Sequence, residues 1–193
     1  MNAAFRNMEE VINKTAEVLG RGGVIIYPTD TIWGLGCDAT NAAAVEKIYS
    51  IKHRDPQKSM LIICADIAMV RGYVAEVTEK IESFLENTDQ PTTVIYPNAR
   101  CLPTNLMASD GSIGIRIPKS EFCRALLGKF GKPIVSTSAN FTGQKAPSNF
   151  SEIDAKLLET VDFVVPESNC DSVSNTSSRI VKLLPDGSFL TLR

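Results

Sequence analysis

Histidine is almost missing from this sequence, and its scarcity excludes several classes of enzyme. The 193 residues include one histidine, His53. A Ser-His-Asp or Cys-His hydrolase would need that residue as its general base. His53 stands between Lys52 and Arg54, a cationic setting that suits a solvated or anion-binding position better than a general base.

Long apolar runs and targeting segments are also missing. The longest apolar runs are a few residues, far short of the roughly 20 that a membrane-spanning helix needs. The N-terminal stretch MNAAFRNMEE carries acids and no apolar core, so it does not look like a secretory signal. We therefore expect no association with a membrane and a cytoplasmic location.

The five cysteines lack the spacing of a disulfide framework or of a local zinc site. They are odd in number and far apart, and they contain no C-x-x-C pair. We interpret them as reduced, mostly buried thiols, in keeping with a cytoplasmic protein. They are Cys37, Cys64, Cys101, Cys123 and Cys170.

The standard phosphate-binding motifs are absent as well. The chain has neither G-x-x-x-x-G-K-[ST] nor G-x-G-x-x-G. The net charge of −2 argues against a globally basic nucleic-acid binder and leaves room for a local basic patch. Apolar residues make up 44% and charged residues 22%, so we expect an ordinary globule with a single domain over residues 1–193.

Strand-like and helical patterns alternate through the first two thirds of the chain, and strands close it. This order predicts an α/β domain with a mixed sheet and flanking helices. Ligands in such folds sit in loops at strand ends. We expect strands near 24–27, 60–64, 92–96, 112–117, 133–135, 161–165, 179–184 and 188–192, the last two joined by a turn at 185–187. Helical segments are expected near 8–19, 42–51, 77–85 and 121–130, and from a capping box at 151–154.

The stretch YPTDTIWGLG, residues 27–36, follows the first expected strand. Its glycines allow backbone N–H groups to approach a ligand, and its threonine hydroxyls can donate and accept. Asp30 could orient a hydroxyl or a metal-bound water. A second interpretation stays open: a glycine-rich connection from strand to helix, with Trp33 in the core.

A cluster of cations follows the second expected helix. Lys52, Arg54 and Lys58 fall within seven residues. Arginine offers a planar fork and lysine a point charge, so the cluster could bind a polyphosphate. The alternative is a solvated helix C-terminus, where cations interact favourably with the helix dipole.

Arg116 lies inside an apolar strand pattern, between Ile115 and Ile117. Period-2 alternation places it with Gly114 on the face opposite the isoleucines. From there it could reach into a concave site and bind a carboxylate with two hydrogen bonds. It could equally lie on a wet face of the sheet.

Two hydroxyl-rich stretches occur late in the chain. STSANFTG, residues 136–143, directly follows an expected strand and could bind phosphate or nucleobase, or form an ordinary cap and turn. NTSSR, residues 175–179, is a second such stretch. The residues alone predict hydroxyls and cations that converge on an anionic ligand, and they do not name a reaction.

Together these stretches resemble one family, the YrdC-like threonylcarbamoyl-AMP synthases. YPTDTIWGLG, KHR with the later KS, SIGIRIP and VSTSANFTG follow the family's order, and the resemblance runs from about Gly22 to SSRIVKL. It implies a twisted α/β sheet around a concave basic cavity. It also implies a nucleotidyltransferase that makes threonylcarbamoyl-AMP from L-threonine, bicarbonate and ATP, with release of pyrophosphate, for tRNA modification.

The resemblance implies roles for individual residues. Thr31 and Arg116 would bind L-threonine, Arg116 through the carboxylate. Lys52 and Arg54 would be catalytic and, with Lys58, would face the triphosphate. The other contacts to ATP would come from Thr93, Ser136, Ser138, Asn140, Ser178 and Arg179.

The resemblance also implies partners. Because no dense carboxylate cluster marks a metal site, we expect Mg²⁺ to arrive on ATP. The product would pass to a tRNA threonylcarbamoyl-transferase, and weak binding of tRNA or double-stranded RNA is a further expected property. Two alternatives stay open: an RNA-binding module without this chemistry, and a paralogue that binds nucleotide and acts on another adenylate.

Overall fold

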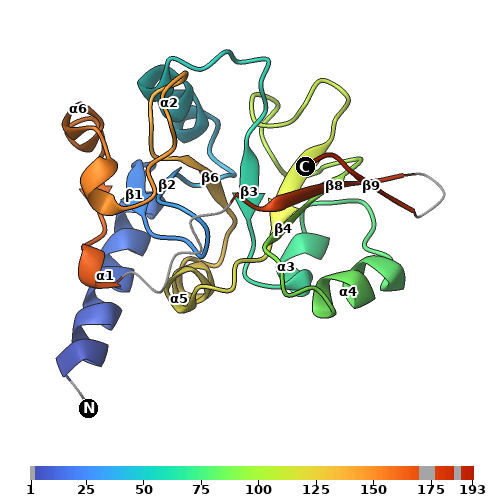
Figure 1. Cartoon of the computed structure of the whole chain (residues 1–193), viewed down its shortest axis with the longest axis horizontal. Coiled ribbons are helices and arrows are strands. Elements are labelled where there is room, and N and C mark those ends of the chain that lie inside the picture. Colours follow the sequence, from blue (N-terminus) through green and yellow to red (C-terminus); the bar gives the residue numbers. More distant parts are fainter. Residues whose placement is uncertain (1–2, 170–176, 185–187) are drawn as a thin grey trace.

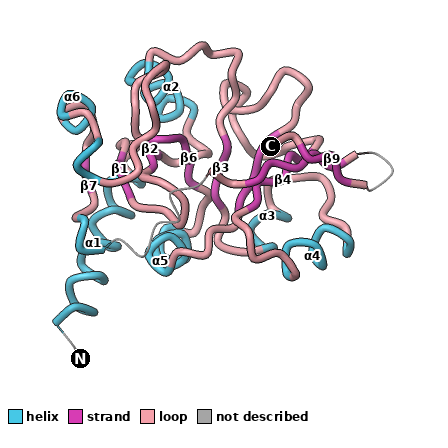
Figure 2. The backbone as a smooth tube through the Cα atoms, in the orientation of Figure 1, coloured by secondary structure: helices cyan, strands magenta, loops and turns pink. Residues whose placement is uncertain are grey.

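The computed structural model describes residues 3–169, 177–184 and 188–193. Within these residues the strands form one twisted mixed sheet (Figures 1 and 2), so the predicted α/β fold is confirmed. Their order is β7-β1-β2-β6-β3-β5-β4-β8-β9. The strands are β1 (Ile25–Tyr27), β2 (Gly34–Gly36), β3 (Leu61–Ile63), β4 (Thr92–Tyr96), β5 (Ile113–Arg116), β6 (Ile134–Ser138), β7 (Phe163–Val164), β8 (Arg179–Leu183) and β9 (Phe189–Thr191).

The helices begin and end at signals that the sequence carries. The Asn41 side chain accepts hydrogen bonds from two amides in the first turn of α2 (Ala42–Lys52), and the Ser120 side chain caps α5 (Glu121–Phe130) by accepting from the Cys123 amide. After α1, Gly22 adopts a φ of 73°, which favours glycine. None of the described helices is long and apolar enough to cross a membrane. The helices are α1 (Ala3–Gly20), α2 (Ala42–Lys52), α3 (Ile67–Arg71), α4 (Glu79–Glu86), α5 (Glu121–Phe130) and α6 (Ala155–Leu158), with 3₁₀ turns η1 (Phe150–Glu152) and η2 (Glu167–Asn169).

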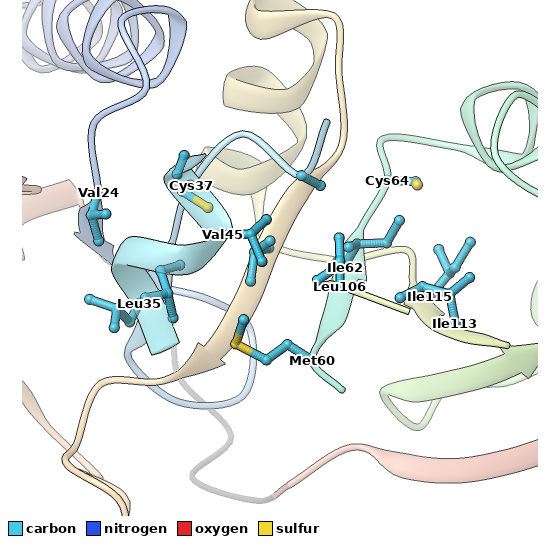
Figure 3. Packing of buried hydrophobic residues seen from close by; sticks show 14 of the residues in the cluster. Val24, Leu35, Cys37, Val45, Met60, Ile62, Cys64, Leu106, Ile113 and Ile115 are labelled. Atoms are coloured by element: carbon cyan, nitrogen blue, oxygen red, sulfur yellow. The ribbon is translucent and has the colours of Figure 1, made fainter. Parts of the chain in front are cut away.

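One face of the sheet packs against α2, α3 and α4. Figure 3 shows Val45 of α2 beside Leu35 of β2 and, further along the sheet, Ile62 of β3 and Ile115 of β5. These strand residues alternate with residues that point to the opposite face. Ile115 is 2% exposed and lies in this core, on the face opposite Arg116 as predicted, whereas Ile117 follows the end of β5 and is half-buried.

Helices cover only part of the opposite face. α1 and α5 lie side by side below the sheet in Figure 1. They pack on a second apolar cluster that includes Tyr27, Ile63, Ile134 and Phe122. The same face continues across β5, β4 and β8, where it forms the floor of a cavity.

The structure corrects the expectation that residues 28–36 form only a connecting loop. Gly34–Gly36 is strand β2, antiparallel to β1. The glycines are needed there because the Tyr27 ring lies against them. A Cβ on Gly36 would lie 2.7 Å from Tyr27 Cε1, and one on Gly34 would lie 3.2 Å from the same atom. Trp33 is buried in the apolar core on the α2, α3 and α4 side of the sheet, with its ring centroid 5.0 Å from that of Phe150.

Three other boundaries differ from the expectation. β6 continues through Ser138, so the start of STSAN is strand rather than loop. The segment after residue 148 opens as η1, capped by Asn149, and α6 begins only after Asp154. The short helix α3 was not expected. The expected turn at 185–187 and Cys170 lie outside the described residues; of the other cysteines, Cys101 is exposed and the rest are buried.

Candidate active site

A cavity of about 590 Å³ lies on the part of the sheet face that α1 and α5 leave open. Its volume is in the range of small-molecule sites. Six serines, four threonines and four cationic residues line it, and none of its described lining residues is an aspartate or a glutamate. This composition favours an anionic ligand with many hydrogen-bond acceptors.

The floor of the cavity is the sheet itself, whereas the sequence pointed to loops at strand ends. Arg116 on β5 lies opposite Thr93 on β4, and Gly114 lies opposite Ile95. Arg116 and Gly114 share the cavity face, as the period-2 pattern predicted. Gly114 leaves the floor without a side chain between Leu61 and the β4 residues.

Arg116 is held at one end of the cavity by an ion pair. Its Nη1 donates to Asp30 Oδ1 at 2.7 Å and to Thr31 Oγ1 at 3.2 Å. The Arg116 side chain is 4% exposed and that of Asp30 is 11% exposed. Arg116 Nε is buried and has no hydrogen-bond partner among the described residues. The guanidinium is therefore fixed on one side and still has an unused donor.

A threonine turn gives the loop after β1 its shape. Thr29 Oγ1 accepts hydrogen bonds from the amides of Thr31 and Ile32 and donates to the Ile32 carbonyl at 2.7 Å. It also lies 3.0 Å from Thr31 Oγ1. This local turn places Asp30 and Thr31 against Arg116. The polar side chains of YPTDTIWGLG at these two positions therefore bind one residue of β5.

Hydroxyl groups form the walls beside this floor. Thr93 Oγ1 and Ser178 Oγ lie 2.9 Å apart and line the cavity together. Ser136 and Ser138 line it from β6. The Tyr27 hydroxyl donates to the Val135 carbonyl at 3.5 Å, and burial raises the pKa of Tyr27, so this phenol stays protonated. The structure thus brings seven of the eleven predicted site residues to one cavity: Thr31, Arg54, Thr93, Arg116, Ser136, Ser138 and Ser178.

The predicted cations are placed differently from one another. Arg54 lines the cavity, and its guanidinium donates to the carbonyls of Lys58 and Ser59, each at 2.9 Å. Lys58 is exposed. Arg179 points away from the described lining: its Nη2 donates to Thr88 Oγ1 at 2.9 Å, and its guanidinium lies over the Phe84 ring.

Lys52 is 2% exposed and does not appear on the described lining. Its Nζ donates to the carbonyl of Ser138 at 2.6 Å and to the carbonyl of Asn140. Burial, with a smaller contribution from Arg54, lowers the pKa of Lys52 to about 8. Asn140 completes this region, since its side-chain amide donates to the carbonyls of Phe141 and Gln144.

Two cavity cations were missed in the sequence. Lys182 lines the cavity from β8, with its Nζ 3.6 Å from Asp110 Oδ2. Arg193 lines it after β9 and donates to the Ser178 carbonyl at 3.2 Å. Lys182 could have been found, because it follows Ile180 at period 2 on a predicted strand. Hydrogen bonds from Ser112 lower the pKa of Asp110, so this neighbour of Lys182 is ionised.

No group of three or more His, Cys, Asp or Glu side chains gathers to hold a metal ion in the described ranges. His53 ends α2 with a left-handed φ of 49° and is exposed, with its ring 6.2 Å from that of Phe141.

Fold and site together define a class of protein: a mixed-sheet α/β domain with a cavity of hydroxyls and cations on the open part of one sheet face. A family model named Sua5/YciO/YrdC, with the description "Telomere recombination", matches residues 17–193. The chain belongs to this family, as the resemblance of its motifs predicted.

Three relatives illustrate the likeness. The threonylcarbamoyl-AMP synthase of Idiomarina loihiensis is 34% identical over 170 residues, which are 86% of this chain and 90% of that protein. The structure of E. coli YciO is 27% identical, with a TM-score of 0.81, and the match covers 95% of this chain and 88% of that one. P. abyssi Sua5 complexed with L-threonine has a TM-score of 0.85 at 21% identity, which shows the shared fold. That match covers 94% of this chain and 53% of Sua5, so this chain spans about half of its length.

Proposed function

We propose that this protein is a cytoplasmic nucleotidyltransferase that makes L-threonylcarbamoyl-AMP from L-threonine, bicarbonate and ATP and releases pyrophosphate. Its similarity to the synthase of I. loihiensis, over 90% of that protein, supports the assignment. The observation that carries it is the cavity, because hydroxyls and cations line it and no aspartate or glutamate is among its described lining residues. Such a lining suits a triphosphate and an amino-acid carboxylate in one site.

Arg116 and Thr31 form the amino-acid end of the cavity in this proposal. Asp30 and Thr31 fix one side of the guanidinium, while the buried Nε has no partner in the described residues. The carboxylate of L-threonine would supply an acceptor for this donor, and bonds of this charged type are strong. The L-threonine in P. abyssi Sua5 agrees with an amino-acid subsite in this fold.

The nucleotide would occupy the rest of the cavity. We propose that Arg54 contacts the phosphates directly, that Lys58 assists from the exposed side, and that Lys52 acts from behind the β6 wall. Mg²⁺ carried by ATP would neutralise further charge. The remaining predicted contacts to ATP are Thr93, Ser136, Ser138, Asn140, Ser178 and Arg179, four of which line the cavity.

The chemistry needs shelter and positioning more than it needs a base. The threonine amine attacks the carbon of bicarbonate, a C–O bond of bicarbonate breaks, and that oxygen leaves as water with a proton from the amine. The resulting carbamate is unstable in water. A carbamate oxygen then forms a bond to the α-phosphorus of ATP. The bond from that phosphorus to the β-phosphate oxygen breaks, and pyrophosphate leaves with the electron pair. Holding three substrates in one cavity removes the entropic cost of their encounter, and neither a histidine nor a covalent nucleophile is required.

The product would pass to a tRNA threonylcarbamoyl-transferase, because a reactive adenylate has to be used before water destroys it. Weak binding of tRNA or double-stranded RNA would then be an accessory property. RNA binding of that kind depends steeply on salt.

Pyrophosphate release from ATP by the purified protein tests the proposal. We expect release only when L-threonine and bicarbonate are both present, and mass spectrometry should find the threonylcarbamoyl adenylate. Pyrophosphate release that does not depend on threonine would contradict the substrate assignment. ATP binding without turnover would favour a nucleotide-binding paralogue, and tight, salt-sensitive RNA binding without turnover would favour the RNA-binding alternative.

A further inference from the structure

The end of β6 is attached to the end of α2 by one buried lysine. Lys52 Nζ donates to the carbonyls of Ser138 and Asn140. These two carbonyls belong to the point where the strand leaves the sheet and the following loop begins. Ser138 itself lines the cavity. A cation on α2 therefore reaches the back of a cavity wall.

Two more contacts join the same segments. The Thr142 amide donates to the carbonyl of Lys52 at 3.1 Å. The His53 ring lies 6.2 Å from the Phe141 ring and is nearly parallel to it, at 25°. The residues from Ser138 to Thr142 are thus joined to the last turn of α2 by both the side chain and the backbone of one residue.

The arrangement has an electrostatic consequence for an anion site. A carbonyl oxygen carries partial negative charge, and carbonyls turned toward the cavity would repel a phosphate. The ammonium of Lys52 holds both oxygens, and the Asn140 amide also donates to the Ser138 carbonyl, at 2.9 Å. No carboxylate forms an ion pair with it in the described part of the chain, and the causes that lower its pKa are burial and Arg54. Its positive charge therefore stays uncompensated behind the wall.

A buried cation without a carboxylate partner is costly to keep. Other interactions have to offset this cost. For Lys52 they are the hydrogen bonds to the carbonyls of Ser138 and Asn140. A cation on the cavity lining, such as the half-buried Arg54, would reach a phosphate with a smaller cost of burial.

We propose that Lys52 is a positioning residue: it fixes the backbone from Ser138 to Thr142 so that the β6 wall presents hydroxyls, and not carbonyl oxygens, to the nucleotide. The part of this proposal that concerns the nucleotide rests on the proposed function. The part that concerns the order of the 138–142 segment does not.

Hydrogen exchange of the ligand-free protein tests the second part. In Lys52→Met, which keeps an unbranched side chain and removes the charge, we expect exchange of the amides in 140–144 to rise about tenfold or more, because hydrogen bonds to a charged donor are lost. In the matched control Lys58→Met, which removes an exposed charge six residues away, exchange in this segment should stay as in the wild type. Unchanged exchange in Lys52→Met would overturn the proposal.

Affinities for ATP and AMP test the first part. A positioning residue acts on the wall as a whole, so Lys52→Met should weaken the binding of ATP and of AMP by similar factors. If Lys52 were a direct ligand of the outer phosphates, its loss would weaken the binding of ATP alone. Loss confined to ATP would overturn the proposal. If the wild type binds neither nucleotide, the proposed function fails, and the exchange result still decides the role of Lys52 in the fold.

A measurement on the wild type covers the case in which Lys52→Met does not fold. The NMR signal of Lys52 Nζ should show slow proton exchange, because the group is buried and bonded twice. We expect added pyrophosphate to leave this signal in place. A large shift on adding pyrophosphate would show direct contact and would overturn the proposal.

Discussion

The two halves of one sheet face differ in what covers them. Under α1 and α5 the face presents an apolar core, and beyond these helices it presents hydroxyls, a glycine and cations. The boundary runs between paired residues: Ile63 on β3 and Arg116 on β5 are partners in register, yet Ile63 lies in the core and Arg116 in the cavity. Along β6 the change occurs within two residues, from Ile134 to Ser136.

The comparison shows that the helices, and not the strands, divide the face into core and site. A strand residue under a helix must be apolar, because a buried polar group without a partner is costly. A strand residue beyond the helices can be polar and serve a ligand. Substitutions in the two halves should therefore separate stability from substrate binding.

The largest effect is expected in the covered half. Ile63→Ala should lower the free energy of unfolding by about 2–5 kcal/mol, because it leaves a cavity among residues that cannot collapse onto it. Urea denaturation measures this loss. The KM values for threonine and ATP of the fraction that stays folded should not change. A raised KM for either substrate would contradict the division of this face into core and site.

The next effect belongs to the neighbour of Ile63 in the open half. Arg116→Ala should remove a charged hydrogen bond worth roughly 1.5–3 kcal/mol, which raises the KM for threonine by about tenfold to a hundredfold and the KM for ATP far less. Steady-state kinetics with each substrate varied measures the difference.

Arg116→Ala also leaves Asp30 buried without its partner, so stability has to be controlled. Arg116→Met combined with Asp30→Asn removes both charges of the pair and should recover stability without recovering threonine binding. Equal rises in both KM values would show that Arg116 does not belong to the amino-acid end.

Gly36→Ala sharpens the boundary itself. Its Cβ would lie 2.6 Å from the Val135 carbonyl oxygen and 2.7 Å from Tyr27 Cε1, so overpacking should cost about 1–3 kcal/mol of unfolding free energy. Gly128→Ala in α5 is the matched control, since nothing lies within 4 Å of its added Cβ. Thermal unfolding of both variants measures the contrast, and equal stabilities would mean that the Tyr27 ring does not require the glycine.

The smallest effect is expected at the paired hydroxyls of Thr93 and Ser178 in the cavity wall. Thr93→Val keeps the shape and removes the bond to Ser178, which should cost about 0.5–1.5 kcal/mol. The loss should appear as a raised KM for ATP, and Thr93→Ser should restore it. A variant that lost stability and kept its ATP affinity would move this pair from the site to the core.

The sequence predicted the fold where period and capping agree, as in α2 with Asn41 and α5 with Ser120. It also predicted the face of Arg116. It missed β2, because glycine is typical of loops and the Tyr27 ring that requires Gly34 and Gly36 is known only after the strands pair. In the same way, nothing in KHR indicates that Lys52 is buried or that its acceptors are 86 and 88 residues away.

Asp30 shows the same limit. The sequence shows that Asp30 carries a charge. It does not show the partner of Asp30, because Arg116 lies 86 residues further along the chain. Local patterns predict which residues carry chemistry, while contacts across the sheet decide what each one does. The assignments of individual residues to ATP and threonine stay predictions until the variants above are measured.

The position of Leu192 and Arg193 has a practical meaning for work with this protein. Both residues line the cavity, while the N-terminal end of α1 projects away from the sheet in Figure 1. An affinity tag or fusion partner joined after Arg193 would leave from the rim of the site and could obstruct substrates. The same tag placed before α1 would stand clear of it, so N-terminal fusions are the sound choice for assays and for crystals soaked with nucleotide.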